Sequence, residues 1–259
     1  MTLVGTYGTA RVEQIMGMPI IVDVRDTDPH GTTVDDVFEW LRHVDETFST
    51  YKEQSAISRL NRGELDLNSI SGEVNEVLHW CEELRVATDG YFDARAVSPA
   101  IVDPSGLVKG WSVDRAGTLL DAAGAENYAI FAGGDILVRG GALPDATWRV
   151  GVQHPVLLDE VAAVLALRDC AIATSGAYAR GDHVVDPHTR TPSSGLLSVT
   201  VIGRELATAD AYATAVFAMG HAGIDWARRL PQRGYEVSLI GEDEIIFSTP
   251  GFPTLAHDQ

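Results

Sequence analysis

Two oxygen-bearing side chains, Asp210 and Thr214, stand four residues apart in the alanine-rich segment Thr-Ala-Asp-Ala-Tyr-Ala-Thr-Ala. Residues four apart on a helix lie on one face, so a helix here presents a carboxylate and a hydroxyl together. Hard oxygen donors of this kind suit Mg²⁺. A plainer interpretation is that the aspartate interacts with the helix dipole while the threonine hydroxyl bonds to the backbone. The spacing alone leaves both interpretations open.

A second candidate segment runs Asp103-Pro-Ser-Gly106-Leu-Val-Lys109-Gly110. Glycines let backbone groups approach a ligand closely, and a lysine at a helix start adds a cation beside the positive end of the helix dipole. This combination suits a phosphate. However, the spacing is neither that of a P-loop nor the GxGxxG of dinucleotide-binding folds, and a Pro-Ser-Gly turn before a helix is common.

A third segment combines small hydroxyl residues with a histidine. Thr174-Ser-Gly-Ala-Tyr178 is followed closely by His183-Val-Val-Asp186-Pro-His-Thr189. Hydroxyls beside a glycine can bond phosphate or ribose oxygens, and a histidine titrates near neutral pH, as a general base must. In the alternative interpretation, His183 begins a half-buried strand and the Asp-Pro pair forms an ordinary turn. The residues favour neither interpretation.

Apolar periodicity predicts the elements that must position these side chains. Helices are expected over residues 33–48, 71–88, 109–123 and 209–219. Strands are expected over residues 10–25, 128–131, 136–139, 148–152, 161–167, 197–201, 236–240 and 244–247. Residues 51–69 are expected to form a polar connection. Because helices and strands alternate without a strict βαβ rhythm, we predict an α+β fold with mixed or antiparallel sheets and packed helices.

The composition describes a folded protein that is strongly acidic. The chain has 259 residues, of which 45% are hydrophobic and 22% charged, and its net charge is −18. That length fits one large domain or two closely packed halves. The charge makes nucleic acid and anionic membrane surfaces poor partners, because binding them requires surplus cations. A single bound nucleotide remains compatible, since a metal ion and a few local cations can offset its phosphates.

Several other classes of protein are excluded by missing motifs. The chain has no Gly-x-Ser-x-Gly elbow, no His-Glu-x-x-His and no Cys-x-x-Cys. Cys81 and Cys170 are too few for a disulfide framework, and we expect both to be buried free thiols. Arg11 and Glu13 interrupt the first twenty residues, and no 18-residue apolar span occurs. We therefore expect no membrane insertion and a cytoplasmic location.

Taken together, the segments resemble the FAD:protein FMN transferase family, the ApbE-type flavin transferases. The matching motifs follow the family's order over roughly residues 16 to 220. They are Met16-Gly17, Asp45-x-x-Phe48-Ser49-x-Tyr51-x-x-x-Ser55-x-x-Ser58-x-Leu60-Asn61, Asp89-Gly90-Tyr91-Phe92-Asp93, Asp103-x-x-Gly106-x-x-Lys109-Gly110-x-x-x-Asp114, Gly133-Gly134-Asp135, Thr174-Ser175-Gly176-x-Tyr178, His183-x-x-Asp186-Pro187-x-Thr189 and Ala209-Asp210-Ala211-x-Ala213-Thr214.

The resemblance implies a reaction and a fold. The reaction is transfer of FMN from FAD to a threonine or serine hydroxyl of an acceptor protein, with AMP released and Mg²⁺ or Mn²⁺ required. Phosphoryl-type transfer depends mainly on charge neutralisation, which a metal ion and a nearby cation supply. The fold implied is a single domain over residues 1–259, with two closely packed halves that form a flavin cleft.

The resemblance also implies roles for individual residues. It makes Asp210 and Thr214 metal-binding side chains, and it makes Gly106 a metal ligand through its backbone carbonyl. His183 matches the general base toward the acceptor hydroxyl. The implied FAD contacts are Met16, Tyr51, Phe92, Asp93, Ala94, Asp103, Lys109 and Val184.

The chain departs from the family pattern at two places. Only nine residues separate Asp93 from Asp103, a shorter stretch than in many relatives, and Arg190 replaces a usual glycine. Both departures bear on contacts with the acceptor protein. Two alternative functions remain: an FAD pyrophosphatase that yields FMN and AMP from the same ligands, and a non-enzymatic FAD-binding protein. The latter would have no need of His183 or Asp210.

Overall fold

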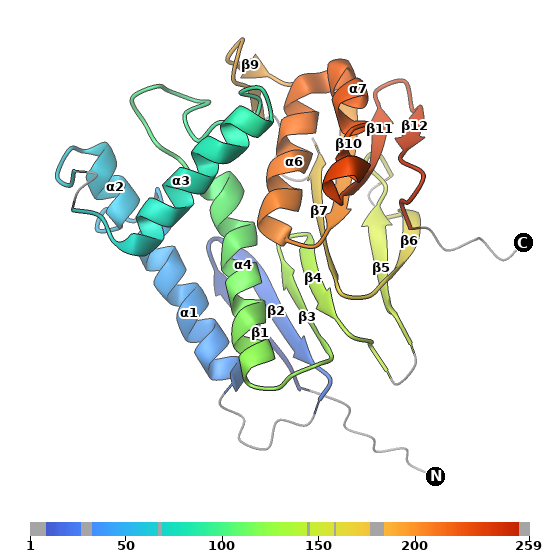
Figure 1. The fold of residues 1–259 in the computed structure, drawn as a ribbon, viewed down its shortest axis with the longest axis horizontal. Helices are drawn as coiled ribbons and strands as arrows, with labels where there is room; N and C mark the ends of the chain where they lie inside the picture. The colour runs from blue at the N-terminus through green and yellow to red at the C-terminus, as the bar shows by residue number, and fades with distance from the viewer. Residues whose placement is uncertain are drawn as a thin grey trace, which may run out of the picture.

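The computed structural model describes residues 9–26, 33–66, 69–143, 146–157, 159–176 and 184–253. Its centre is an eight-stranded sheet in the order β1-β2-β3-β4-β7-β10-β11-β12, with every neighbouring pair antiparallel (Figure 1). The strands of this sheet are β1 (Thr9–Ile15), β2 (Met18–Val24), β3 (Tyr128–Ala132), β4 (Asp135–Arg139), β7 (Cys170–Gly176), β10 (Leu196–Gly203), β11 (Glu236–Gly241) and β12 (Ile246–Ser248). The predicted α+β class is confirmed.

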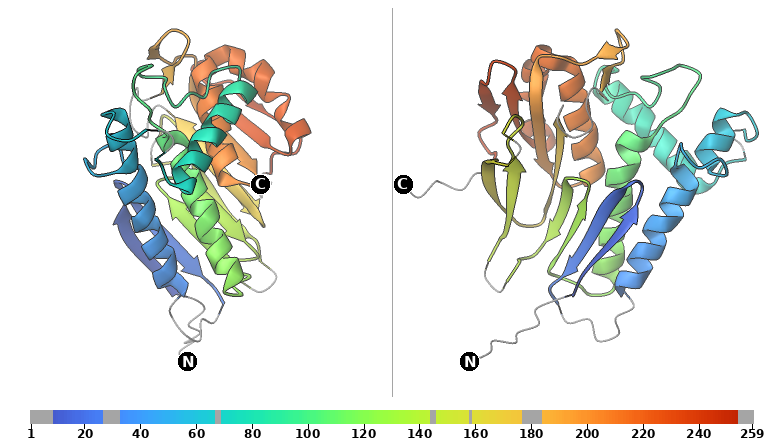
Figure 2. Two further views of the ribbon diagram at one scale, coloured as in Figure 1. Left: turned by 60° about the vertical axis from the view of Figure 1, so that its left-hand side comes forward. Right: turned by 180° about the vertical axis from the view of Figure 1, so that it is seen from behind.

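Helices cover one face of the sheet. They are α1 (Thr33–Phe48), α2 (Ala56–Asn61), α3 (Gly72–Ala87), α4 (Ser105–Ala122), α6 (Leu206–Met219) and α7 (Gly223–Ala227), with short 3₁₀ turns η1 (Gly220–Ala222) and η2 (Leu230–Arg233). Of these, α1, α4 and α6 lie side by side, and α3 passes across the upper part of α4 (Figures 1 and 2). Their apolar faces and the near face of the sheet form the main core, in which Trp111, Phe38 and Leu107 are fully buried.

The opposite face of the sheet carries a hairpin of β5 (Trp148–Gln153) and β6 (Val161–Leu167). Trp148, Leu165 and Leu167 pack there against sheet residues such as Ile136 and Ile172, which forms a second, smaller core. A two-stranded ribbon, β8 (Val185–Asp186) with β9 (Thr191–Pro192), lies apart from both cores at the top of the molecule in Figure 1.

The structure corrects several predicted elements. Residues 10–25 form two strands, because Met16 and Gly17 both adopt positive φ (54° and 73°) and close a tight hairpin. The predicted helix over 109–123 begins earlier, at Ser105, so Lys109 lies one turn inside α4 and is not at its start. The connection over 51–69 contains the short helix α2. A central strand, β7, was not predicted, because Ile172 is the one residue of high β propensity among its buried positions, and the others are alanine, serine and glycine.

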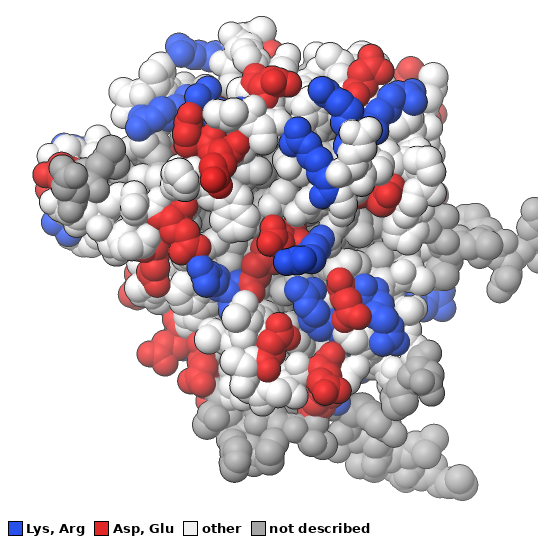
Figure 3. Space-filling view, viewed as in Figure 1, with Lys and Arg blue, Asp and Glu red and all other residues white. Residues whose placement is uncertain are grey.

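Charged side chains of both signs share the face of the molecule that carries the helices. Acidic residues prevail over α1 and basic residues gather toward α7 (Figure 3). None of the helices in the described ranges is long and apolar enough to cross a membrane. Both cysteines are free, as expected; Cys81 is buried, whereas Cys170 is only half-buried.

Candidate functional site

An ammonium group between two carboxylates forms the centre of the candidate site. Lys109 Nζ of α4 lies 2.5 Å from Asp135 Oδ2 at the start of β4 and 3.3 Å from Asp210 Oδ2 of α6. Both aspartates are buried, with exposed fractions of 1% and 5%. Burying a carboxylate is costly unless it is paired. In the described part of the chain, the Lys109 ammonium faces both of these buried carboxylates.

The close approach of α4 and α6 brings Lys109 to Asp210. Gly110 makes this approach possible, since a Cβ there would lie 2.6 Å from the Cα and N atoms of Ala207. One turn further along α4, Asp114 accepts hydrogen bonds from the backbone N–H groups of Leu206 and Ala207, each at 2.9 Å. These are the first two residues of α6, whose free N–H groups need acceptors. A side chain of α4 thus caps the helix that carries the predicted metal ligands.

Asp135 is fixed by its own surroundings. It follows the turn Gly133-Gly134, in which both glycines have positive φ (61° and 119°). Its Oδ1 accepts a hydrogen bond of 3.1 Å from the backbone N–H of Thr174 on β7. One carboxylate oxygen is therefore anchored to the sheet, and the other faces Lys109.

Hydroxyl groups extend the cluster along α6. Thr214 is half-buried, and its Oγ1 lies 3.4 Å from Ser175 Oγ on β7. Asp210 and Thr214 lie one turn apart on the same face of α6, as the sequence predicts. Asp210 lies in the second turn of a helix that is buried over nearly its whole surface.

The carboxylates set the protonation state of the lysine. Burial alone would lower the pKa of Lys109, but the charges of Asp135 and Asp210 and their hydrogen bonds outweigh burial and raise the pKa above its ordinary value. The ammonium is therefore charged throughout the physiological range. For Asp114, burial dominates over the two backbone hydrogen bonds and raises the pKa to about 6.

The residues present fit a divalent cation with hard oxygen ligands. Asp210 supplies a carboxylate and Thr214 a hydroxyl, and both are oxygen ligands of the kind that Mg²⁺ prefers. Gly106 lies in the first turn of α4, one turn before Lys109 on a similar face, and a Cβ at Gly106 would meet the ring of Phe92 at 3.2 Å. In the described part of the chain, no three His, Cys, Asp or Glu side chains gather as a metal site. Any metal site here must therefore draw on hydroxyl or carbonyl ligands as well.

The segment before α4 contains four of the predicted FAD contacts. Phe92 is buried and donates its backbone N–H to Thr88 Oγ1 at 2.9 Å. Further along, the N–H of Asp103 bonds to the carbonyl of Ala94 at 2.7 Å, and Asp103 Oδ1 accepts from the N–H of Ser105. Asp93 Oδ1 accepts from the N–H of Arg95. Among these four residues, Phe92 is the buried one. Its side chain packs against Gly106 and offers no open surface.

Asn61 explains how the shortened stretch between Asp93 and Asp103 is held. Its side chain bonds to both backbone groups of Val102, donating to the carbonyl and accepting from the N–H, each at 2.8 Å. Asn61 closes the motif that begins at Asp45, and the structure gives it a role in fixing this loop.

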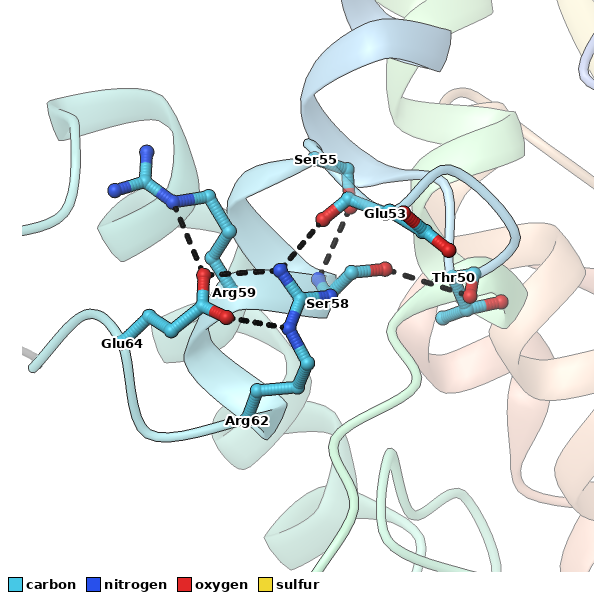
Figure 4. Close-up of polar contacts among 7 residues, drawn as sticks. All are labelled: Thr50, Glu53, Ser55, Ser58, Arg59, Arg62 and Glu64. Atoms are coloured by element: carbon cyan, nitrogen blue, oxygen red, sulfur yellow. Dashed lines mark hydrogen bonds and ion pairs between the residues drawn. The ribbon is translucent and has the colours of Figure 1, made fainter.

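The rest of that motif builds the connection between α1 and α2. Ser55 caps α2 by accepting from the N–H of Ser58 at 3.0 Å, and its hydroxyl donates to the carbonyl of Ser49. Figure 4 shows this turn together with Arg62, which pairs with Glu64. The turn presents Tyr51 to solvent with 97% of its surface exposed. A fully exposed aromatic side chain on a braced turn is available to stack on a ligand.

The last predicted contacts come from two turns. Met16 lies in the hairpin between β1 and β2, partly buried against the main core. Val184, 8% exposed, precedes β8 and accepts from the N–H of Ser193 at 3.0 Å. His183, the predicted general base, lies outside the described residues, as does Tyr178. The structure thus gathers Lys109, Asp210 and Thr214, while the role of His183 stays a prediction.

The β8–β9 ribbon is tied to the segment that follows α3. His188 Nε2 lies 3.0 Å from the carbonyl oxygen of Asp89, and its ring meets that of Tyr91 edge-on with centroids 4.5 Å apart. Arg190 adopts φ 58°, in the left-handed region that glycine favours. A glycine would adopt this backbone conformation with less strain than arginine does.

A cavity of about 340 Å³ lies elsewhere, on the side of α4 that faces α1 and α3. Trp40, Glu76, Trp111 and Arg115 are among the residues that line it, and none of the predicted site residues does. The Lys109 cluster is therefore distinct from this cavity. Sequence reasoning gave no role to Asp135, although its place directly after two glycines marked it in the motif.

The chain thus combines an antiparallel α+β fold with a lysine that faces two buried carboxylates and with adjoining hydroxyl groups. The model of the ApbE family matches residues 16–101 and 94–237, and the chain belongs to this family.

Three curated relatives share the same protein name. The chain is similar to proteins named FAD:protein FMN transferase from Vibrio cholerae serotype O1 (36% identity over 129 residues, covering 46% of this chain and 39% of that protein), Rhodobacter capsulatus (36% over 168 residues, 60% and 31%) and Escherichia coli K12 (33% over 159 residues, 57% and 44%). The matched region thus spans less than half the length of these relatives.

Solved structures share the fold. The ApbE protein of Thermotoga maritima superimposes with a TM-score of 0.85 at 23% identity, covering 94% of this chain and 97% of that chain. The flavin transferase ApbE of Vibrio cholerae superimposes with a TM-score of 0.84 at 23% identity, covering 96% and 99%. At this level of identity the likeness concerns the fold.

Proposed function

We propose that this chain, acting as one unit, transfers FMN from FAD to a threonine or serine hydroxyl of an acceptor protein. The observation that carries the proposal is the Lys109 ammonium held between two buried carboxylates, with the Thr214 and Ser175 hydroxyls beside them. Membership of the ApbE family and the name shared by its curated relatives support the choice of flavin chemistry.

The reaction balances without an oxidant or reductant. The acceptor hydroxyl oxygen attacks the phosphorus of the FMN half of FAD, and a new P–O bond forms. The bond from that phosphorus to the oxygen bridging the pyrophosphate breaks, and AMP leaves with this oxygen. The proton of the hydroxyl passes to a base. Charge accumulates on the phosphate oxygens, so neutralising that charge is the main task of the protein.

The residues of the cluster divide this task. Lys109 supplies a permanent cation beside the pyrophosphate, since its pKa is raised. Asp210 and Thr214 would hold a divalent cation, with the carbonyl of Gly106 as a further ligand. When bound, Mg²⁺ or Mn²⁺ supplies charge neutralisation at the pyrophosphate. Tyr51, whose side chain is exposed, would stack on a ring of FAD.

His183 is proposed as the base that takes the proton from the acceptor hydroxyl. The assignment rests on the family resemblance and on the titration range of histidine. Val184, the first described residue after it, is held to the β8–β9 ribbon by Ser193.

The test is incubation with FAD, MgCl₂ and a library of threonine- and serine-containing peptides, followed by mass spectrometry of the peptides and chromatography of the nucleotides. We expect FMN-modified peptides and an equal amount of AMP. Asp210→Ala should abolish both products, while Asp225→Ala, which removes a carboxylate that is 94% exposed, should preserve them. FMN and AMP without modified peptide would identify a pyrophosphatase instead. Bound FAD without turnover would identify a flavin-binding protein.

A further inference from the structure

One feature of the cluster exceeds what ligand binding requires: Asp135 is buried and charged, yet matches none of the implied metal ligands or FAD contacts. It is 1% exposed, and its anchored oxygen leaves only Oδ2 free to face Lys109. Removing a carboxylate from water costs several kcal/mol of solvation free energy. If the residue at this position only filled space, an apolar side chain would therefore be more stable there.

The geometry shows which carboxylate the lysine favours. Lys109 Nζ approaches Asp135 Oδ2 to 2.5 Å but stays 3.3 Å from Asp210 Oδ2. A cation bound by Asp210 would compete with the ammonium for that oxygen. With Asp135 as its principal partner, the ammonium can give up Asp210 and still be compensated.

We propose that Asp135 is a positioning residue, which holds the Lys109 ammonium so that the Asp210 carboxylate is available to a divalent cation. The inference rests on the proposed function only for the identity of that cation site. In this arrangement Asp135 determines the affinity for the cation without touching it. The lysine stays in place for the ligand, and the metal does not displace it.

The test measures Mg²⁺ affinity by titration calorimetry, with Mn²⁺ binding followed by loss of the free-ion EPR signal, on protein without FAD. Asp135→Asn keeps the shape but removes the charge, so Lys109 turns to Asp210. We expect the dissociation constant for Mg²⁺ to rise on the order of tenfold. Asp135→Glu, which restores the charge, should recover part of the affinity.

Thr200→Val is the matched control. Thr200 is 2% exposed on β10, next to β7, and its hydroxyl pairs with that of Thr174 at 3.0 Å. The variant disturbs the same layer without changing charge, so Mg²⁺ affinity should stay within about twofold of wild type. Thermal unfolding of every variant confirms that the comparison is between folded proteins.

A double-mutant cycle separates competition by the lysine from a simple loss of negative charge. Lys109→Met should tighten Mg²⁺ binding in the Asp135→Asn background, because in that background the ammonium pairs with Asp210. The gain in affinity should be at least about threefold larger there than in the wild-type background, where the ammonium pairs mainly with Asp135. Equal gains in both backgrounds would mean fixed, additive charges and would overturn the proposal. Absence of Mg²⁺ binding by the wild type would overturn it as well.

These outcomes are independent of FMN transfer. A wild type that transfers FMN but shows an additive cycle refutes the role of Asp135 alone. A coupled cycle in a protein that transfers no FMN supports the role of Asp135 while refuting the proposed function.

Discussion

Two lysine–aspartate pairs of equal length occupy different surroundings in this protein. Lys109 and Asp135 lie 2.5 Å apart, with 23% of the lysine and 2% of the aspartate side chain exposed. Lys52 and Asp45 also lie 2.5 Å apart, but nearer the surface, with 46% and 18% exposed. Water and salt screen the surface pair, so its contribution to stability is small. Lys109 instead helps to keep the carboxylates of both Asp135 and Asp210 buried.

The first prediction compares these pairs. Lys109→Met removes the ammonium that faces the buried carboxylates of Asp135 and Asp210 and should lower the free energy of unfolding by about 3 kcal/mol. It should also weaken FAD binding, which flavin fluorescence measures. Lys52→Met should cost no more than about 1 kcal/mol and leave FAD affinity unchanged. Equal losses of stability in urea denaturation would contradict the special role of the interior pair.

A second prediction concerns His183. If His183 accepts the proton of the acceptor hydroxyl, His183→Ala should bind FAD and Mg²⁺ nearly as well as wild type but transfer FMN on the order of 10²-fold more slowly. The wild-type rate should rise with pH, because only neutral histidine accepts a proton. Stopped-flow kinetics measures these rates. His79→Ala, which changes an exposed histidine of α3, is the control. Loss of FAD binding by His183→Ala would indicate a structural role.

At the scale of elements, the contact between α4 and α6 decides the site. It depends on a glycine for its closeness and on an aspartate for its polarity. Gly110 lets the start of α6 approach the backbone of α4, and Asp114 bonds to the two leading N–H groups of α6. Any change that separates the two helices also separates Lys109 from Asp210.

Gly110→Ala tests the closeness of this contact. Alanine normally stabilises a helix interior relative to glycine, but here the new methyl group would meet backbone atoms of Ala207, which cannot rotate away. We expect a loss of about 2 kcal/mol or more in the free energy of unfolding, together with weaker Mg²⁺ binding. Gly72→Ala is the control, since a Cβ at the start of α3 meets nothing within 4 Å. That variant should be neutral or slightly stabilised.

Asp114→Asn tests the polarity of the contact through its pH dependence. Burial raises the pKa of Asp114 to about 6 in the folded chain, from an ordinary value of 3.8, so the folded state binds its proton more tightly than the unfolded state. This contribution to stability is therefore full below pH ~4 and is lost as pH rises through ~6. Between pH ~4.5 and ~7 the loss should be roughly 2 kcal/mol.

Asparagine does not titrate, so the variant should lack this decline. Urea denaturation at the two pH values gives the difference in unfolding free energy between wild type and Asp114→Asn. We expect Asp114→Asn to become more stable relative to the wild type as pH rises. A pH-independent difference would show that the carboxylate is already ionised at pH ~4.5.

Several elements could be predicted because local patterns determine them, while others depend on distant partners. The spacing of Asp210 and Thr214 was sufficient to place both on one face of a helix. The true start of α6 was not visible, since its cap, Asp114, is 92 residues away from Leu206 in the chain. Likewise, the pairing of Lys109 with Asp135 requires knowledge of how α4 lies on β4. The hairpin at Met16 was missed because a non-glycine residue adopts positive φ there.

At the scale of the whole molecule, the net charge is the main electrostatic influence on stability. A charge of −18 on a compact chain generates repulsion that favours unfolding. Raising NaCl from about 10 mM to about 300 mM screens this repulsion and should raise the midpoint of thermal unfolding by a few °C, measured by calorimetry. Near the isoelectric point of about 4.6 the same salt increase should have little effect. A midpoint that is independent of salt at neutral pH would contradict this expectation.

The capping of α6 by α4 has a consequence for how the chain acquires its structure. While the protein is being synthesised, Lys109 and Asp135 emerge long before α6, so no early segment can complete the cluster. Contacts between residues so distant in sequence form late and slow the search for the native state, because the loop between them must first be closed. We therefore expect the candidate site to form late in folding, after α4, β4 and α6 have come together.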